Sequence, residues 1–426
     1  MMSVISKKYG VLAVSTFAFT ICFMIWMMFA VLGIPIKQML HLNGAQFGLL
    51  ASMPVLSGSL ARLPLGILTD RFGGRPVFFV LMLICIPAVF MLRYAHTYPQ
   101  FLELGFLIGL LGGSFSVGIA YVSHWFDPSQ QGFAMGIFGA GNSGAALTKL
   151  IAPILILTWG WQSVPILYAL ILSFTAALFG LIAQAEPGQV IRSRSGSTLT
   201  LRLLLSPRVL RYCQYYSIVF GGYVALALWL TEYYVAQYGC NIQRAALLAA
   251  CFSLPGGILR AVGGWISDRC GAHSVTWWVM WVSWLCLFVL SYPPTDLIIH
   301  GTTGALALHI ELHVVLFTVL MLTVGVAFAF GKASVFKYIA DDYPEDMGIV
   351  SGVVGLAGGL GGFALPILFG WLQDMTRIRS SCFMLLFAIV SVSLVALYFS
   401  EIRRAPLLGP LRFHSYPNEP VPMTEE

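Results

Sequence analysis

Long apolar stretches, separated by short polar breaks that often contain Pro or Gly, run along almost the whole chain. A membrane-spanning helix needs roughly 20 such residues, with a range of about 17–25. The first stretch follows Lys7 and Lys8 and is too long for a secretory signal. The pattern predicts twelve spans, at about 10–36, 44–69, 77–93, 99–124, 131–157, 163–184, 210–236, 243–268, 274–291, 311–339, 347–373 and 379–401.

Composition agrees with an all-α polytopic membrane protein. Of the 426 residues, 58% are hydrophobic and 9% are charged, and the mean hydropathy is +0.86. An average soluble domain carries about 25% charged residues. A soluble enzyme, a nucleic-acid-binding protein and a disordered chain are therefore excluded. The eight cysteines form no C-x-x-C pair, so we expect neither a metal site nor a cofactor.

The distribution of basic residues predicts the topology. A Ser- and Arg-rich linker at 185–209 separates two apolar halves, at 1–184 and 210–404, and a polar tail follows at 405–426. With the N-terminus inside, 14 Lys and Arg residues lie at inner ends and 5 at outer ends. This asymmetry fits the positive-inside rule. We expect a protein of the cell (inner) membrane with its N- and C-termini in the cytoplasm.

The two halves repeat each other. Residues 66–75 (GILTDRFGGR) follow the second span, and residues 264–271 (GWISDRCG) end the eighth. Asp70 and Asp268 are 198 positions apart, and so are Arg62 and Arg260. Two six-helix bundles related by an axis along the membrane normal, with a site at their interface, are typical of transporters.

The repeated stretch resembles the loop signature of the major facilitator superfamily, and the resemblance covers about residues 8–405. It implies twelve transmembrane helices in two pseudo-twofold six-helix bundles. It also implies that the loop contacts neighbouring helices at the cytoplasmic side and steadies one conformational state. That role falls on Asp70, Arg71, Arg75, Asp268 and Arg269. The second copy departs from the signature at Cys270 and at 272–273, so its contribution is expected to be weaker.

Four cations fall within the predicted spans, namely Arg62, Lys149, Arg260 and Lys332, and no acidic residue falls mid-span. An unpaired cation at the bilayer centre costs about 2.5–3.5 kcal/mol on insertion scales. The natural counter-charge is then a ligand, and we expect an anionic substrate. Arginine presents paired N–H donors that match two oxygens of an oxyanion, and it stays charged. The alternative is that these side chains reach an interface or helix carbonyls.

Glycine tracts occur in corresponding helices of the two halves, in spans 5 and 11. In lipid, such tracts allow close helix packing and bending. They indicate hinge or gate helices at a moving interface, and simple small-residue packing is the alternative. The glycines concerned are Gly139, Gly141, Gly144, Gly358, Gly359, Gly361 and Gly362.

These residues together resemble the nitrate/nitrite porter family. Its two glycine signatures are similar to residues 139–144 (GAGNSG) and 357–363 (AGGLGGF), and its paired arginines match Arg62 and Arg260. The resemblance implies that both arginines bind the anion. It also implies that Asn142 adds a hydrogen bond and that aromatic rings cover the flat face of the anion, these rings being Phe115, Tyr216 and Phe220. Without the resemblance, Tyr216 and Phe220, which lie one helical turn apart, would be read as core packing.

Symport and exchange differ in what the site must contain. An exchanger needs only an empty, doubly charged site that cannot reorient, whereas a proton symporter needs a titratable group. A desolvated lysine can serve, which makes Lys332 and Lys149 the candidates. Residues 331–337 (GKASVFK) also resemble the shorter, symporter branch of the family.

We therefore expect nitrate import by proton symport with alternating access. The partners are nitrate, protons and the lipid bilayer, with nitrite left open as a substrate, and the protein is expected to be a monomer. A nitrate/nitrite antiporter is the alternative, and a small-carboxylate anion exchanger is a further one. A membrane enzyme or a transporter-like receptor is disfavoured. Lastly, His309, Glu311 and His313 are expected at the outer end of the tenth span, with the histidines as an i, i+4 helical pair. We expect an interfacial polar cluster there, and a metal site at the histidine pair is the alternative.

Overall fold

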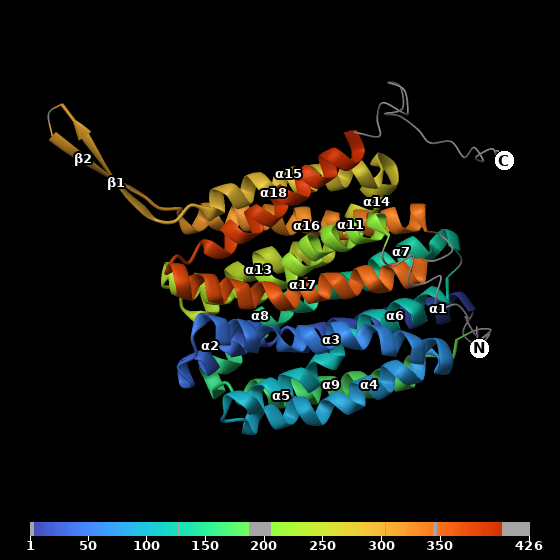
Figure 1. Ribbon diagram of the computed structural model, residues 1–426. Coiled ribbons are helices and arrows are strands. Elements are labelled where there is room, and N and C mark those ends of the chain that lie inside the picture. Colours follow the sequence, from blue (N-terminus) through green and yellow to red (C-terminus); the bar gives the residue numbers. More distant parts are fainter. Residues whose placement is uncertain (1–3, 127, 187–205, 303, 344–346, 403–426) are drawn as a thin grey trace.

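The computed structural model describes residues 4–126, 128–186, 206–302, 304–343 and 347–402. Its helices run roughly parallel and form two bundles that lie side by side (Figure 1). In lipid, every backbone polar group must be satisfied within the chain, so apolar stretches of this length become helices. We call the end of the bundle where α9 stops and α11 begins the linker side. The opposite end, from which β1 and β2 project, is the hairpin side (Figure 1).

The first bundle contains nine helices and three short 3-10 segments within the described residues. They are α1 (Val4–Trp26), α2 (Phe29–Met39), α3 (Gly44–Phe72), α4 (Gly74–Met91), η1 (Leu92–Tyr94), α5 (Tyr98–Gly109), η2 (Leu110–Gly113), α6 (Ser114–Ser123), α7 (Pro128–Gly139), η3 (Ala140–Ser143), α8 (Gly144–Trp159) and α9 (Ser163–Ile182).

The second bundle adds a π-helical segment and a two-stranded hairpin to its helices. Its elements are α11 (Pro207–Tyr216), η4 (the π-helical segment, Ser217–Gly222), α12 (Tyr223–Tyr238), α13 (Ile242–Ile258), α14 (Arg260–Cys270), α15 (Ala272–Ser291), β1 (Thr295–Gly301), β2 (Gly304–Ile310), α16 (Val314–Asp342), α17 (Met347–Thr376) and α18 (Ser381–Ile402).

The helices confirm the membrane spans that the apolar stretches predict. Within the described residues, 11 helical segments are long and apolar enough to cross a membrane, and the pair α13–α14 makes up to 12 if it counts as one span. This pair is bent by 47° at Leu259. Residues 187–205 of the linker predicted at 185–209, and the whole tail predicted at 405–426, lie outside the described residues. The division into domains stays a prediction.

The repeated loop has the same backbone in both halves. Gly73 ends α3 with φ +88°, and Gly271 ends α14 with φ +80°. A residue with a Cβ rarely adopts such a conformation, so glycine is needed where each helix turns sharply into the next. The repeat read from the sequence is thus a repeat of structure.

The hairpin was not predicted. Residues Thr295–Gly301 and Gly304–Ile310 pair as antiparallel strands, with Asp296 opposite His309. The expected helical pair of His309 and His313 is wrong, because His309 lies in β2 and His313 is the N-cap of α16. Residues four positions apart share a face only within a continuous helix, and these two histidines belong to different elements.

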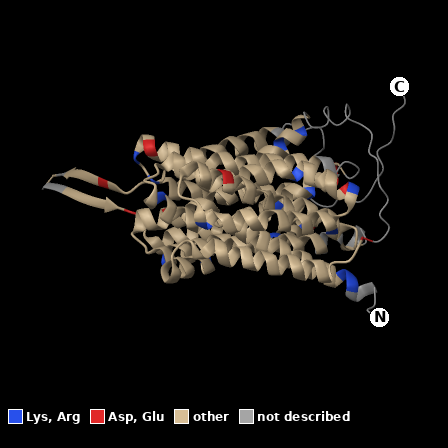
Figure 2. Cartoon of the chain, turned by 90° about the horizontal axis from the view of Figure 1, so that it is seen from below, with Lys and Arg blue, Asp and Glu red and all other residues tan. Residues whose placement is uncertain are grey.

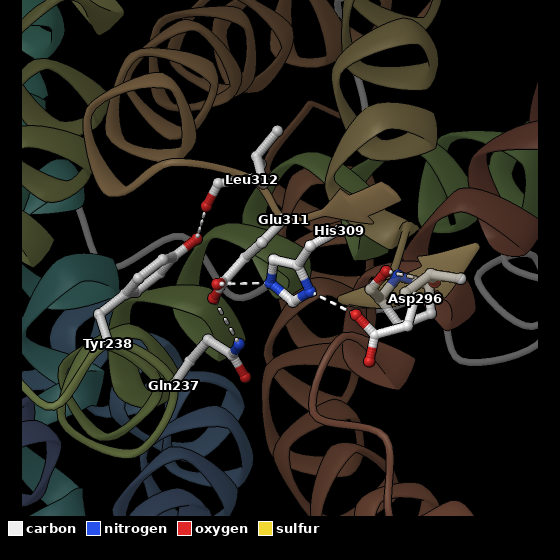
Figure 3. A network of polar contacts seen from close by, with 8 residues as sticks. Gln237, Tyr238, Asp296, His309, Glu311 and Leu312 are labelled. Carbon is white, nitrogen blue, oxygen red and sulfur yellow. Dashed lines mark hydrogen bonds and ion pairs between the residues drawn. The ribbon is translucent and has the colours of Figure 1, made fainter. Parts of the chain in front are cut away.

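The base of the hairpin nevertheless holds a polar cluster, shown in Figure 3. The His309 ring lies between Asp296, at 2.6 Å, and Glu311, at 3.5 Å. Gln237 of α12 donates to Glu311 at 3.4 Å, and the Tyr238 hydroxyl donates to the Leu312 carbonyl at 3.0 Å. These contacts tie the hairpin to the end of α12.

Candidate anion-binding site

Two arginines approach one aromatic ring at the junction of the two bundles. The guanidinium carbon of Arg62 lies 5.7 Å from the centre of the Phe115 ring, and that of Arg260 lies 5.3 Å from it. Arg62 lies inside the unbroken helix α3, whereas Arg260 is the first residue of α14, after the bend. Residues from α3, α6 and α14 thus meet at one point, although they are far apart in the sequence.

All four intramembrane cations are buried. The exposed fractions are 5% for Arg62, 9% for Arg260, 1% for Lys149 and 0% for Lys332. None of them has a carboxylate within ion-pair distance in the part of the chain that the structure describes. The alternative in which they reach an interface is therefore wrong, whereas Arg62 and Lys332 do donate to helix carbonyls, those of Gly355 and Gly256. Figure 2 shows how sparse charge is along the body of the bundle.

The buried donors of this region are incompletely satisfied. Among the described residues, eleven buried side-chain N and O atoms lack a hydrogen-bond partner, and four of them belong to the predicted site residues: Arg62 Nε, Arg260 Nη1, Asn142 Nδ2 and the Tyr216 hydroxyl. A buried donor without a partner costs about 1–3 kcal/mol, and more when it is charged. A bound ion or an ordered water is one explanation for such a group, and here the four atoms surround two unpaired cations.

Aromatic rings surround the two arginines. Tyr216 and Phe220 stack with their ring centres 5.1 Å apart and their planes 7° apart. The Arg62 guanidinium lies 5.0 Å from the centre of Phe220. Tyr216 is the last residue of α11, and Phe220 lies in the π-helical segment η4 that follows it. Such single-turn π segments inside helices occur frequently at functional sites.

Phe336 completes the set of rings and was missed in the sequence. The Arg260 guanidinium lies 5.1 Å from the centre of the Phe336 ring, which also meets Tyr216 edge-on at 5.2 Å. Phe336 follows Lys332 by one helical turn, and residues at that spacing share a helix face. That spacing from a predicted intramembrane lysine could have indicated Phe336 as a site residue.

The glycine tracts lie where backbones and rings approach closely. A Cβ on Gly358 would overlap the Tyr216 ring, one on Gly359 the Ser59 side chain, and one on Gly144 the backbone of α1. A Cβ on Gly139 would lie 3.5 Å from Arg260 Cδ. The remaining three members also face neighbours: Gly141 faces Phe19, Gly361 faces Ser217, and Gly362 faces Val224 and Val55. Close packing is thus one role of both tracts, and their role as hinges stays a prediction.

The two lysines contact the helix α13. Lys149, in the first bundle, donates to the hydroxyl of Ser253 in the second. Lys332 donates to the carbonyl oxygen of Gly256 at 2.6 Å, and its ammonium lies 3.5 Å from the centre of the Tyr223 ring. Tyr223 in turn donates to the Ser253 carbonyl at 2.8 Å. Both lysines therefore contact the stretch of α13 just before the bend that leads to Arg260.

The repeated loops contact neighbouring helices on the linker side. Arg75 donates to the Gly180 carbonyl at 3.0 Å, and Asp268 lies 3.7 Å from Lys337 of α16. Arg71 and Arg269 lie over their neighbours Phe72 and Trp265, at 5.2 Å and 4.0 Å from the ring centres. Asp70 is exposed.

On the hairpin side, polar contacts join the two bundles. Lys37 lies 2.6 Å from Glu232. Asp374 of α17 accepts hydrogen bonds of 3.0 Å from the backbone N–H groups of Gly44 and Ala45, at the start of α3. These contacts hold the bundles together at that end.

The fold, the repeat and the junction site define a class of membrane transporter, and comparison with known proteins agrees. Residues 14–366 match the profile of the Major Facilitator Superfamily. A bacterial homologue of the human lysosomal transporter Spinster, solved in an inward-facing and occupied conformation, has a similar fold. Its TM-score is 0.70 at 14% identity, and the match covers 95% of this chain and 99% of that one.

Sequence relatives narrow the class. The probable nitrate/nitrite antiporter NarK1 of Thermus thermophilus is 39% identical over 412 residues, which cover 93% of this chain and 92% of that protein. The probable nitrate transporter NarT of Staphylococcus carnosus is 30% identical, covering 91% and 95%. The nitrite extrusion protein of Bacillus subtilis is 29% identical, covering 92% and 94%. The chain belongs to the nitrate/nitrite porter family of the major facilitator superfamily.

Proposed function

We propose that this protein imports nitrate across the cytoplasmic membrane by proton symport with alternating access. The observation that carries the proposal is the set of unpartnered buried donors at the junction of the bundles: Arg62 Nε, Arg260 Nη1, Asn142 Nδ2 and the Tyr216 hydroxyl. Two of these groups are positively charged, and no carboxylate of the described residues forms an ion pair with them. A small anion bound there completes their hydrogen bonds and offsets their charge.

The shape of the site favours a flat anion. Nitrate is planar and weakly hydrated, so flat aromatic faces and bidentate guanidinium groups suit it. Phe115, Phe220 and Phe336 each lie within 6 Å of an arginine guanidinium. A tetrahedral, strongly hydrated anion such as sulfate would lose more hydration against these rings. The names of the relatives support nitrate and nitrite as substrates.

Lys332 is our candidate for the proton-coupling group. Arginine cannot release its proton, whereas a buried lysine can. Lys332 shares a helix face with Phe336, which contacts Arg260. An anion bound at Arg260 would favour the protonated form of a lysine so close to it. Proton and nitrate would then move together, and Lys149 is the second candidate.

Alternating access would proceed by rocking of the bundles about this junction. Lys37–Glu232 and the Asp374 contacts would open when the site faces the hairpin side, which the distribution of basic residues makes the outer side. The termini are then cytoplasmic. The loops at Asp70 and Asp268 would steady one state, and the glycines of α7–α8 and α17 would permit the motion.

Exchange of nitrate for nitrite is the second candidate function, and the name of the Thermus relative favours it. Proteoliposomes with an imposed inward proton gradient and no internal anion separate the two. Nitrate uptake under these conditions supports symport, and uptake that requires internal nitrite supports exchange.

Variants then test the coupling group. Lys332→Gln should abolish nitrate-driven proton entry, and Lys149→Gln tests the second candidate. Lys8→Gln, at the start of α1 and bonded to Gln130, should keep proton entry. Unchanged proton entry in Lys332→Gln would remove Lys332 from the mechanism.

A further inference from the structure

The hairpin formed by β1 and β2 extends beyond the ends of the helices (Figure 1). Each strand has seven residues, which gives a length of roughly 23 Å at about 3.4 Å per residue. An isolated two-stranded hairpin is at best marginally stable in water. The two strands therefore need a further surface on which to pack.

One face of the hairpin is aliphatic. Directly paired residues of antiparallel strands point to the same face, and successive residues alternate between the faces. This face carries two direct pairs and one position beside them: Leu297–Leu308, Ile299–Leu306 and Ile310. All five side chains are exposed, from 41% to 57%. We call these five residues the aliphatic face.

The opposite face carries the polar side chains. Asp296 pairs directly with His309, and their side chains are 80% and 60% exposed. Ile298 and His300 follow on the same face. The hairpin is thus amphipathic. Its strands contain no lysine or arginine, so the aliphatic face rather than charge supplies the attraction to any partner.

Lipid-facing side chains lie directly beside the base of the hairpin. Residues 292–294 alone separate α15 from β1, and residues 311–313 alone separate β2 from α16. Both helices are membrane spans, and exposed apolar side chains at their ends include Phe288, Tyr292 and Val315. The hairpin therefore begins at the level where the hydrocarbon region meets the headgroups.

We propose that the hairpin lies in the headgroup region of the bilayer, with the aliphatic face toward the acyl chains and with Asp296 and His309 toward water. Amphipathic helices lie in this plane for the same reason, since one face prefers lipid and the other prefers water. The outer edges of both strands carry unpaired backbone N–H and C=O groups. Such edges do not occur within the hydrocarbon region, so headgroups and water set the depth of the hairpin.

A lipid surface fits the aliphatic face better than a second copy of the chain does. Two hairpins packed face to face would bury only about 500 Å² in total, from roughly 23 Å by 10 Å on each partner, whereas a specific interface needs about 1,000 Å². The membrane is already present at the base of the hairpin, and it covers all five side chains at once.

The contact has a consequence for the second bundle. At the base of the hairpin, Gln237 donates to Glu311 and the Tyr238 hydroxyl donates to the Leu312 carbonyl. Both donors belong to α12, which continues from η4 and so from Phe220. A hairpin held by lipid would fix this end of α12 relative to the membrane while the first bundle moves. This consequence, unlike the lipid contact itself, rests on the proposed alternating access.

Spin labels on cysteine variants of the full chain in phosphatidylcholine vesicles test the proposal. The two exposed cysteines, Cys251 and Cys270, are first replaced by serine. Labels are then compared at neighbouring positions of each strand, in the matched pairs Ile299→Cys with Ile298→Cys and Leu308→Cys with Ala307→Cys. Collisions with oxygen report lipid, and collisions with a nickel chelate report water.

The ratio of oxygen to nickel collisions should be about tenfold higher at positions 299 and 308 than at 298 and 307, which corresponds to about 1.4 kcal/mol of reagent transfer. Adding phosphatidylglycerol to the vesicles should leave this difference unchanged, because the strands carry no lysine or arginine. With the label at 299, the double variant Leu306→Gln/Leu308→Gln should lower the ratio about tenfold. Ala307→Gln, on the polar face, is the matched control and should not change it.

Three results would overturn the proposal. Equal ratios at the labelled positions, with ready access for nickel, would place the hairpin in water. Loss of access to both reagents at 299 and 308 would mean that protein covers the aliphatic face. Spin–spin broadening that disappears on dilution with unlabelled protein would identify a second copy as the cover. Size-exclusion profiles check folding, and the labelled single variants decide the question by themselves if the double variant aggregates.

Discussion

Arg62 Nη1 in the first bundle donates a hydrogen bond of 2.7 Å to the carbonyl oxygen of Gly355 in the second. Gly355 has no side chain, and a Cβ there would lie 3.4 Å from the same nitrogen. One of the two cations of the site is thus bonded across the junction about which we propose that the bundles rock. An anion bound at Arg62 would act directly on this contact, as coupling of substrate to conformation requires.

Tyr216→Phe tests whether the Tyr216 hydroxyl contributes to nitrate affinity or to the stability of the fold. The hydroxyl is buried and has no partner among the described residues, so its removal should leave the unfolding temperature of the ligand-free protein unchanged or raise it. Nitrate affinity should fall about tenfold or more, since the hydroxyl loses a hydrogen bond to a charged group. Thermal unfolding with and without nitrate measures both. A lower unfolding temperature with unchanged affinity would make the hydroxyl structural.

Phe336→Leu removes the ring that lies on Arg260. A desolvated cation–π contact is worth about 2 kcal/mol, so nitrate affinity should fall by about tenfold or more. Phe336→Tyr keeps the ring and should keep most of the affinity. The control is Phe174→Leu, in α9, whose side chain is 63% exposed. Equal affinities for Phe336→Leu and wild type would exclude Phe336 from the site.

The Lys37–Glu232 pair predicts unequal costs for its two partners. The Glu232 side chain is 8% exposed and that of Lys37 is 24% exposed. Lys37→Met leaves the buried Glu232 carboxylate without a partner. Removing one partner of a fully buried pair lowers the free energy of unfolding by about 3–5 kcal/mol. Glu232→Gln leaves a lysine that can turn toward water. We therefore expect the larger drop in unfolding temperature for Lys37→Met.

The double variant Lys37→Met/Glu232→Gln should recover part of that loss. Asp341→Asn, in the exposed pair with Lys337, should cost less than about 1 kcal/mol and serves as the control. Equal losses for Lys37→Met and Glu232→Gln would show that burial does not govern this contact.

His309 predicts a pH dependence of the hairpin. The hydrogen bonds that the His309 ring donates to Asp296, and secondly to Glu311, raise the pKa of His309 above its ordinary value of 6.5. Because the folded pKa is raised, the stabilisation is complete below 6.5 and is lost as the pH rises through the folded value. An NMR titration of the ring should give a pKa above 6.5 that is lowered toward the ordinary value in Asp296→Asn. A pKa at or below 6.5 in the wild type would contradict the network.

The spans could be predicted because bilayer thickness fixes the length of an apolar stretch, and the repeat located Arg62 and Arg260 because it places them at matching positions. The hairpin could not be predicted in this way. Its strands are only seven residues long. Because they lie between two predicted spans, apolar residues such as Leu297 and Ile299 were counted as part of a connecting loop.

The neighbours of the site residues were beyond the sequence for a different reason. Helix periodicity gives the face on which a residue lies, but it does not give the rotation of one bundle against the other. The acceptors of Arg62, Lys149 and Lys332 lie on Gly355, Ser253 and Gly256. Two of these are backbone carbonyls, which no side-chain pattern marks.

Nitrate binding to purified protein carrying Arg62→Lys or Arg260→Lys tests the central claim most directly. Lysine keeps the charge but loses the bidentate fork, so each variant should bind nitrate about 100-fold more weakly or worse, a loss of about 2.7 kcal/mol. Arg93→Lys, which alters an arginine stacked on Tyr94 toward the hairpin side, should bind as wild type does. Wild-type affinity in both Arg62→Lys and Arg260→Lys would contradict the anion site described above.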